Sequence, residues 1–340
     1  MFIHEIINQA PSDHVAIEGD ERVTYGELRN LVSLYRNQLY EMGIRRGMKV
    51  GLYSANRAEF IYVHLAVISL GAVIIPINNS LVDREADYIL KDGEASLLVT
   101  DTKLSVSIPS VDIHDLDFQA RQRKASEAPA FPSDLTEDEV CAFVYTSGTT
   151  GSPKGAMLTH RNLVRNVEQF TQMVIFKPED KILCVLPMFH CYGLTTVIHA
   201  GLMHGSTIVI LRSKNPSEII NAIVEHSVTM AIMVPPMYNL LARRADFTAL
   251  FAMSDVIAFG AIRALVSAGF RVPEDVSVIG FDGITMSRYC VPVLTTVVQP
   301  SEQISLQSIE LLVRQIEHGA PAQTITLQPE LQQGESVRAI

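Results

Sequence analysis

Short apolar runs alternate with amphipathic stretches in the first part of the chain. Buried strands are predicted where several apolar residues follow one another, and helices where apolar residues recur every three or four positions. The motif Thr24-Tyr-Gly-Glu27 fits a capping box at a helix start. Up to residue 100 the pattern predicts two short strand-like pieces within 13–24, strands at 49–53, 72–77 and 96–100, and helices at about 25–42, 55–70 and 82–91.

The same rhythm continues to the end of the chain. Thr159 is the predicted N-cap of a helix over 159–171. Further strands are predicted at 181–186, 206–211, 228–234, 248–253, 276–281, 294–298 and 323–327, and further helices near 193–203, 216–226, 236–245, 255–268 and 301–318. This alternation predicts an α/β protein with doubly wound, mostly parallel sheets that carry helices on both faces, in two lobes.

Four parts are predicted along the chain. Residues 1–120 form an N-terminal α/β subdomain, and the polar, proline-containing stretch 121–137 is a loop. Residues 138–246 form a second α/β subdomain, and residues 247–340 form the last part. The resemblances to two families, stated below, imply that the second subdomain is incomplete and that the last part is a half-domain of a different kind.

Charge and composition narrow the class of protein. The 48% hydrophobic and 19% charged residues are ordinary for a globular α/β protein. A formal net charge of −10 argues against nucleic acid as a partner. The apolar stretch 63–77 is too short and too interrupted for a membrane span, so no membrane partner is expected. Four cysteines without metal-ligand spacing, two of them (Cys141 and Cys184) in strand-like runs, predict buried free thiols and a cytoplasmic location.

The main candidate for chemistry is the segment Tyr145-Thr-Ser-Gly-Thr-Thr-Gly-Ser-Pro-Lys-Gly155, which follows the apolar run 140–144. Its glycines permit a close approach of the backbone to a ligand, and its N–H groups, hydroxyls and lysine supply donors to an anion. It is not a Walker loop, because no Ser or Thr follows the lysine. The predicted contacts to nucleotide phosphates are Thr146, Ser147, Gly148, Thr149, Thr150, Gly151 and Lys154. The alternative is a Ser/Gly-rich surface turn.

Residues 145–155, continued by 156–163, resemble the phosphate loop of the adenylate-forming superfamily, which includes acyl-CoA synthetases. The resemblance implies an ATP- and Mg²⁺-dependent acid–thiol ligase that binds a nucleoside triphosphate and a carboxylic acid. Lys154 would then have a weak catalytic role. Within Pro187-Met-Phe-His190, His190 would border the acyl pocket, and Pro235-Pro-Met-Tyr238 would lie beside it. The alternative for His190 is a half-buried histidine that caps a strand end.

Other motifs of that superfamily do not occur in these 340 residues. They are a Gly-Gly turn that supports adenine, a Tyr-Gly-x-Thr-Glu motif that binds the metal, a Thr-Gly-Asp segment that holds ribose, and a distal lysine. Lys214 is the last lysine of the sequence. We therefore expect weak binding of ATP and Mg²⁺, no protein metal ligand among the assigned residues, and little or no adenylation.

From about residue 248 the sequence resembles a different family. The segments 248–261, 271–283 and 292–300 are similar to the C-terminal part of the effector-binding domain of lactose-repressor-type regulators. The resemblance implies that Ser254, Asp255 and Asp282 face a sugar or purine effector. The alternatives are helix N-capping for Ser254 and Asp255 and a turn role for Asp282. The first lobe and the DNA-binding motif of those regulators are absent from the sequence.

Three functional hypotheses follow. The favoured one is a chimera-like chain that binds phosphate but adenylates little or not at all. The second is an active ATP-dependent acyl-CoA synthetase-like ligase. The third is a sugar- or purine-sensing module without a DNA-binding domain.

Overall fold

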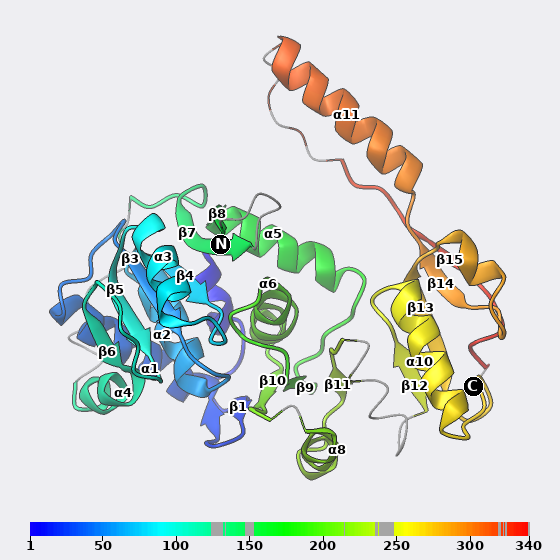
Figure 1. The fold of residues 1–340 in the computed structure, drawn as a ribbon, viewed down its shortest axis with the longest axis horizontal. Coiled ribbons are helices and arrows are strands. Elements are labelled where there is room, and N and C mark those ends of the chain that lie inside the picture. Colours follow the sequence, from blue (N-terminus) through cyan, green and yellow to red (C-terminus); the bar gives the residue numbers. More distant parts are fainter. Residues whose placement is uncertain are drawn as a thin grey trace. The chain divides into compact units, whose positions relative to one another are not determined.

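The computed structural model describes residues 1–123, 132, 134–146, 153–213, 215–234, 237, 248–318, 321, 323 and 325–338. It divides into two compact units, Met1–Ile232 and Met233–Ile340. Figure 1 shows helices alternating with strands in both. The α/β class predicted from the alternation is confirmed. The predicted seam between residues 246 and 247 lies outside the described residues, as does all of the predicted helix 236–245 except Met237.

The first unit contains a six-stranded sheet with the order β6-β5-β3-β4-β7-β8. All neighbours are parallel except the antiparallel pair β7–β8. The carboxyl ends of the parallel strands meet at one edge, which is where ligands bind in such sheets. The strands are β3 (Lys49–Tyr53), β4 (Val73–Ile77), β5 (Ala95–Thr100), β6 (Ser110–Asp112), β7 (Val140–Thr146) and β8 (Lys154–Thr159).

A second sheet of the first unit has the order β11-β9-β10-β1-β2. Its strands are β1 (Val15–Glu18), β2 (Val23–Thr24), β9 (Lys181–Cys184), β10 (Thr207–Ile210) and β11 (Met230–Ala231). Both sheets combine strands from before and after the predicted loop at 121–137: β1 pairs with the later strand β10, and β7 pairs with the earlier strand β4. The two predicted subdomains therefore interleave within one unit.

Local sequence explains most helices of the first unit. Thr24 and Glu27 form the predicted capping box of α1 (Tyr25–Glu41). Thr159 caps α5 (His160–Thr171), and Asn215 caps α8 (Pro216–Glu225). The remaining helical elements are η1 (Ile3–Asn8), α2 (Ala58–Ser69), α3 (Asp83–Asp92), α4 (Ile113–Arg121), α6 (Cys191–Gly193), the π-helix η3 (Leu194–His199) and α7 (Ala200–Met203).

Helix α2 is buried along almost its whole length, and only Glu59 escapes burial. A helix that is apolar all round needs cover on every side. It packs against β3 and β4 and also contacts α1 and η1. On the side of the second sheet, its His64 contacts His199 of η3. The helix is therefore a common core element of both sheets.

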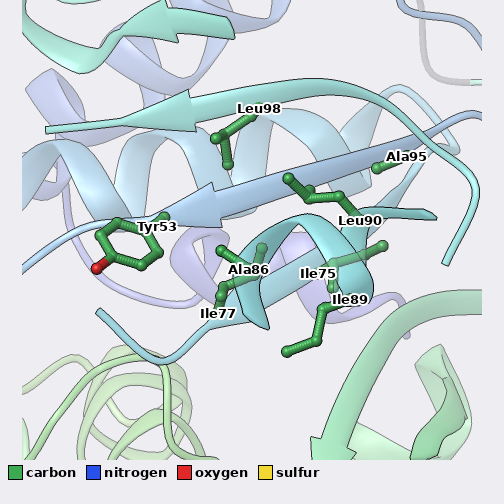
Figure 2. Packing of buried hydrophobic residues seen from close by; sticks show 8 residues of the cluster. All are labelled: Tyr53, Ile75, Ile77, Ala86, Ile89, Leu90, Ala95 and Leu98. Carbon is green, nitrogen blue, oxygen red and sulfur yellow. The ribbon is translucent and has the colours of Figure 1, made fainter. Parts of the chain in front are cut away.

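Helix α3 covers the opposite face of the six-stranded sheet. Figure 2 shows Ala86, Ile89 and Leu90 of α3 among strand residues that alternate toward this face, such as Ile75 and Ile77. Successive residues of a strand point to opposite faces, so this alternation leaves Ile74 for the α2 side. The packing fixes α3 firmly against the strands that end at the candidate site.

The second unit contains a four-stranded sheet with the order β12-β13-β14-β15. β12 (Ala249–Phe251), β13 (Ser277–Asp282) and β14 (Thr295–Val298) are parallel, and β15 (Glu330–Gln332) is antiparallel to β14. The helices are α10 (Asp255–Ser267), the short η5 (Thr285–Arg288) and α11 (Ser301–His318). No described residue of α11 is buried, and Figure 1 shows this helix extending beyond the sheet of its unit.

Several elements differ from the prediction. β6 and α4 lie where no strand or helix was predicted, as do the short η1 and η5. Helix α4 is short and follows the N-cap Asp112. β8 was not predicted; none of its residues is buried, so it lacks the apolar alternation of a half-buried strand. Among the described positions of 323–327 there is no strand, and β15 follows at 330–332 instead. Among the residues that the structure describes, no helix is both long enough and apolar enough to cross a membrane.

Candidate functional site

A pocket of about 910 Å³ lies at the carboxyl ends of β4 and β7. The first turns of α3 and the segment before α6 form its other walls. Its lining combines apolar and aromatic residues with a few polar groups, as is usual for ligand pockets. The lining includes Glu85, Tyr145, Thr146, His190 and Cys191.

The strand pair β7–β8 carries the two ends of the predicted phosphate loop. Its register places Thr146 opposite Lys154 and Tyr145 opposite Gly155. Thr146 and Lys154 are exposed. Lys154 forms no ion pair with any carboxylate in the described ranges. The predicted contacts Ser147, Gly148, Thr149, Thr150 and Gly151 lie outside the described residues.

Tyr145 connects this strand pair to α3. Its hydroxyl donates a hydrogen bond of 2.7 Å to Oδ2 of Asp92, the last residue of the helix. Burial, followed by the hydrogen bond to Asp92, raises the pKa of Tyr145, so the phenol remains a proton donor.

His190 lines the pocket and also begins a helix. It is the N-cap of α6, and its Nδ1 accepts a hydrogen bond of 3.1 Å from the backbone N–H of Tyr192. The sulfur of Cys191 lies 3.9 Å from the same Nδ1. The helix cap therefore makes Nδ1 of His190 the hydrogen-bond acceptor. The side chain is exposed, whereas the alternative reading of the sequence predicted it to be half-buried.

Asn56 holds the segment that carries His190. Its Nδ2 donates to the carbonyl oxygens of Leu186 at 2.9 Å and Cys184 at 3.3 Å, and its Oδ1 accepts from Met188 N–H at 2.9 Å. Asn56 is buried and follows β3 of the other sheet. One side chain thus joins the carboxyl ends of both sheets beside the pocket. Sequence reasoning missed this residue, although a polar residue just after a predicted strand is a usable signal.

A family model described as AMP-binding enzyme matches residues 3–278. The chain belongs to the AMP-binding enzyme family. This finding agrees with the resemblance of residues 145–163 to adenylate-forming enzymes.

Similar AMP-binding enzymes include CoA ligases. The chain is 33% identical over 245 residues to 4-coumarate–CoA ligase 3 of Oryza sativa subsp. japonica, covering 67% of this chain and 44% of the relative. It is 29% identical over 266 residues to the long-chain-fatty-acid–CoA ligase FadD13 of Mycobacterium tuberculosis, covering 75% and 51%. The chain spans about half the length of these relatives.

Solved structures of AMP-binding enzymes share the fold. The O-succinylbenzoate coenzyme A synthetase of Bacillus subtilis, in complex with AMP, gives a TM-score of 0.68 at 23% identity over 84% of this chain and 74% of that one. The N-terminal domain of FACL13 from Mycobacterium tuberculosis gives 0.69 at 24% identity, over 84% and 76%.

In the second unit, the predicted effector residues have roles in folding. Ser254 caps α10 and accepts a hydrogen bond from Ile257 N–H. Asp255 is fully buried; its Oδ2 accepts from Ile284 N–H at 2.8 Å and its Oδ1 from the hydroxyl of Thr296. These contacts agree with the capping alternative for Ser254. Effector contact by either residue stays a prediction.

Asp282, at the end of β13, has an unusual backbone. Its φ of 119° lies in a region that residues other than glycine rarely adopt. Burial raises the pKa of its carboxyl group, and Gln299 Nε2 donates to its Oδ1 at 2.9 Å. Strain of this kind often marks a binding site, and effector contact by Asp282 stays a prediction.

The described residues offer little to a metal ion. They contain no group of three or more His, Cys, Asp or Glu side chains arranged to hold one. Glu85, the pocket's only carboxylate within the described lining, already accepts a hydrogen bond from Val82 N–H. The described lining of the pocket thus supplies one carboxylate, and no further acidic side chain, to a Mg²⁺ ion.

Proposed function

We propose that residues 1 to about 246 of this AMP-binding enzyme bind the triphosphate of ATP and a carboxylic acid, as the corresponding part of an acid–thiol ligase. One observation carries the proposal. Thr146 lines the same pocket as His190, and the β7–β8 register sets Lys154 opposite Thr146. A hydroxyl and a cation there suit phosphate oxygens, and the apolar pocket suits an acyl group.

We propose further that residues 248–338 are the C-terminal part of a repressor-type effector domain. The family match extends to residue 278 and so covers the first repressor-like segment, 248–261, and most of the second, 271–283. Residues 279–338 remain as support: Asp282 lies at the end of β13, and β14 is parallel to that strand. The chain then joins two incomplete proteins.

A chain made of these two parts is predicted to bind phosphate and to catalyse little or no adenylation. Catalysis of adenylation needs donors and cations aimed at the charge that develops on the reacting phosphate. The adenine, ribose and metal motifs of adenylate-forming enzymes do not occur in the sequence. Calorimetric titration with ATP and Mg²⁺ tests the binding. We expect Lys154→Ala to abolish ATP binding. Lys49→Ala is the control and should leave ATP binding unchanged, because Lys49 is the first residue of β3 and lies at the end of the strand away from the pocket.

An active ligase is the alternative, favoured by the CoA-ligase relatives. ATP–pyrophosphate exchange with a panel of aromatic and long-chain carboxylic acids separates the two. Exchange above the level of Lys154→Ala supports the ligase, and its absence in a protein that binds ATP supports the chimera.

Sensing of a sugar or purine is a second alternative, favoured by the strained backbone of Asp282. A thermal-shift screen with sugars and purines tests it. A shift that disappears in Asp282→Ala supports sensing, and no shift with any ligand counts against it. The buried thiols Cys141 and Cys184 support the proposal of a cytoplasmic location.

A further inference from the structure

The aromatic ring of Tyr145 lies over the backbone of β8. A Cβ atom built on Gly155 would come within 2.9 Å of Cζ and 3.0 Å of Cε2 of this ring. Real Cβ atoms do not approach so closely, so only glycine permits the ring to occupy this position. The ring therefore packs directly on the residue that follows Lys154.

The hydroxyl of the same tyrosine reaches a fixed acceptor. Asp92 ends α3, whose Ile89 and Leu90 are packed into the core against β3, β4 and β5. A Cβ on the neighbouring Gly93 would come within 3.3 Å of the Tyr145 oxygen, so the hydroxyl packs tightly against this backbone. The hydrogen bond thus ties the strand pair to a rigid part of the unit.

Thr146 and Lys154 form the cross-strand pair next to Tyr145 and Gly155. Side chains alternate between the faces of a strand pair, so Tyr145 faces α3 while Thr146 and Lys154 face the other way. A constraint on one face of a two-stranded ladder sets the position of the neighbouring pair on the other.

We propose that Tyr145, held by Asp92, is a positioning residue that fixes Thr146 and Lys154 for phosphate binding. This inference rests on the proposed function. A well-packed aromatic ring with one directed hydrogen bond does this better than an apolar contact alone, because the hydrogen bond selects one orientation of the ring.

The test compares four variants of the full chain. Tyr145→Phe removes the hydrogen bond and keeps the ring, and Gly155→Ala displaces the ring. Asp92→Asn keeps an oxygen acceptor and is the conservative rescue. Tyr35→Phe is the matched control, because it breaks a tyrosine–aspartate hydrogen bond (to Asp117, 2.5 Å) between α1 and α4.

Titration with ATP and Mg²⁺, and separately with inorganic tripolyphosphate, measures the dissociation constant. We expect Tyr145→Phe and Gly155→Ala to raise it about three- to tenfold, Asp92→Asn about twofold or less, and Tyr35→Phe not at all. An unchanged constant in Tyr145→Phe overturns the inference, as does an equal rise in Tyr35→Phe.

Failure of the wild-type protein to bind either anion would refute the proposed function instead. Amide hydrogen exchange in 140–146 and 154–159 then decides the positioning by itself. Faster exchange there in Tyr145→Phe than in Tyr35→Phe supports the inference, and equal exchange overturns it.

Discussion

The Nε2 atoms of His64 and His199 lie 3.0 Å apart in the interior of the first unit. Both side chains are fully buried, and Phe60 stacks on His64. One Nε2 must donate and the other accept, so the accepting ring must be neutral, and burial disfavours a charge on either ring. Burial lowers the pKa of His64 to about 3, and burial together with its partner lowers the pKa of His199.

Stability of the first unit is expected to fall in acid for this reason. Above pH 6.5 these histidines are neutral in both the folded and the unfolded chain, and the free energy of unfolding has its full value. As the pH drops from 6.5 toward 3, the unfolded state binds protons that the folded state does not. Each such histidine then removes about 1.4 kcal/mol of unfolding free energy per pH unit.

Denaturant unfolding at several pH values between 7 and 4 measures this slope. His199→Leu should make it shallower by about one proton, although burial also lowers the pKa of His4 to about 3 and of His160 to about 4. Parallel slopes in the two proteins would contradict the role of the pair.

Replacement of Asn56 should weaken both the fold and the pocket. Asn56→Ala leaves the carbonyl of Leu186 and the N–H of Met188 without their buried partner. We expect a loss of about 1–3 kcal/mol of unfolding free energy, measured by denaturant titration. Asn56→Asp should be worse, because its carboxylate would face the carbonyl oxygens of Leu186 and Cys184.

Asp255 should prove structural in the second unit. Asp255→Ala removes the acceptor of Ile284 N–H and of the Thr296 hydroxyl in a fully buried place. The second unit should lose about 2–4 kcal/mol of unfolding free energy. If Asp255→Ala instead leaves stability intact and abolishes a ligand-induced thermal shift, the residue is an effector contact.

The apolar side chains of α11 should contribute little to folding. Ile309 is 62% exposed and Ile316 is 74% exposed. Replacing both by Gln is expected to change the unfolding free energy by less than about 0.5 kcal/mol per site. A larger loss would show that these side chains are buried in solution, for instance between two copies, and analytical ultracentrifugation of both proteins would reveal that.

The sequence predicted best what local chemistry decides. The capping box at Thr24 and Glu27 and the apolar run of β3 are local signals, and both elements formed where expected. The sequence did not predict β8, because pairing with β7, and not the pattern of its own side chains, makes it a strand. Pairing of this kind depends on contacts between distant residues, which periodicity does not report.

The candidate site shows the same division. Lys154 and His190 stand in recognisable motifs, and both lie at or beside the pocket. Asn56 and Asp92 belong to no motif, because each acts through a partner more than 50 residues away in sequence. Only the folded arrangement brings such pairs together.

Helix α2 packs on β3 and β4, and its His64 contacts η3, which packs on β9 of the other sheet. The interior around α2 therefore depends on elements of both sheets at once. A change of sequence after Ile232 would leave these contacts untouched, because that residue ends the first compact unit.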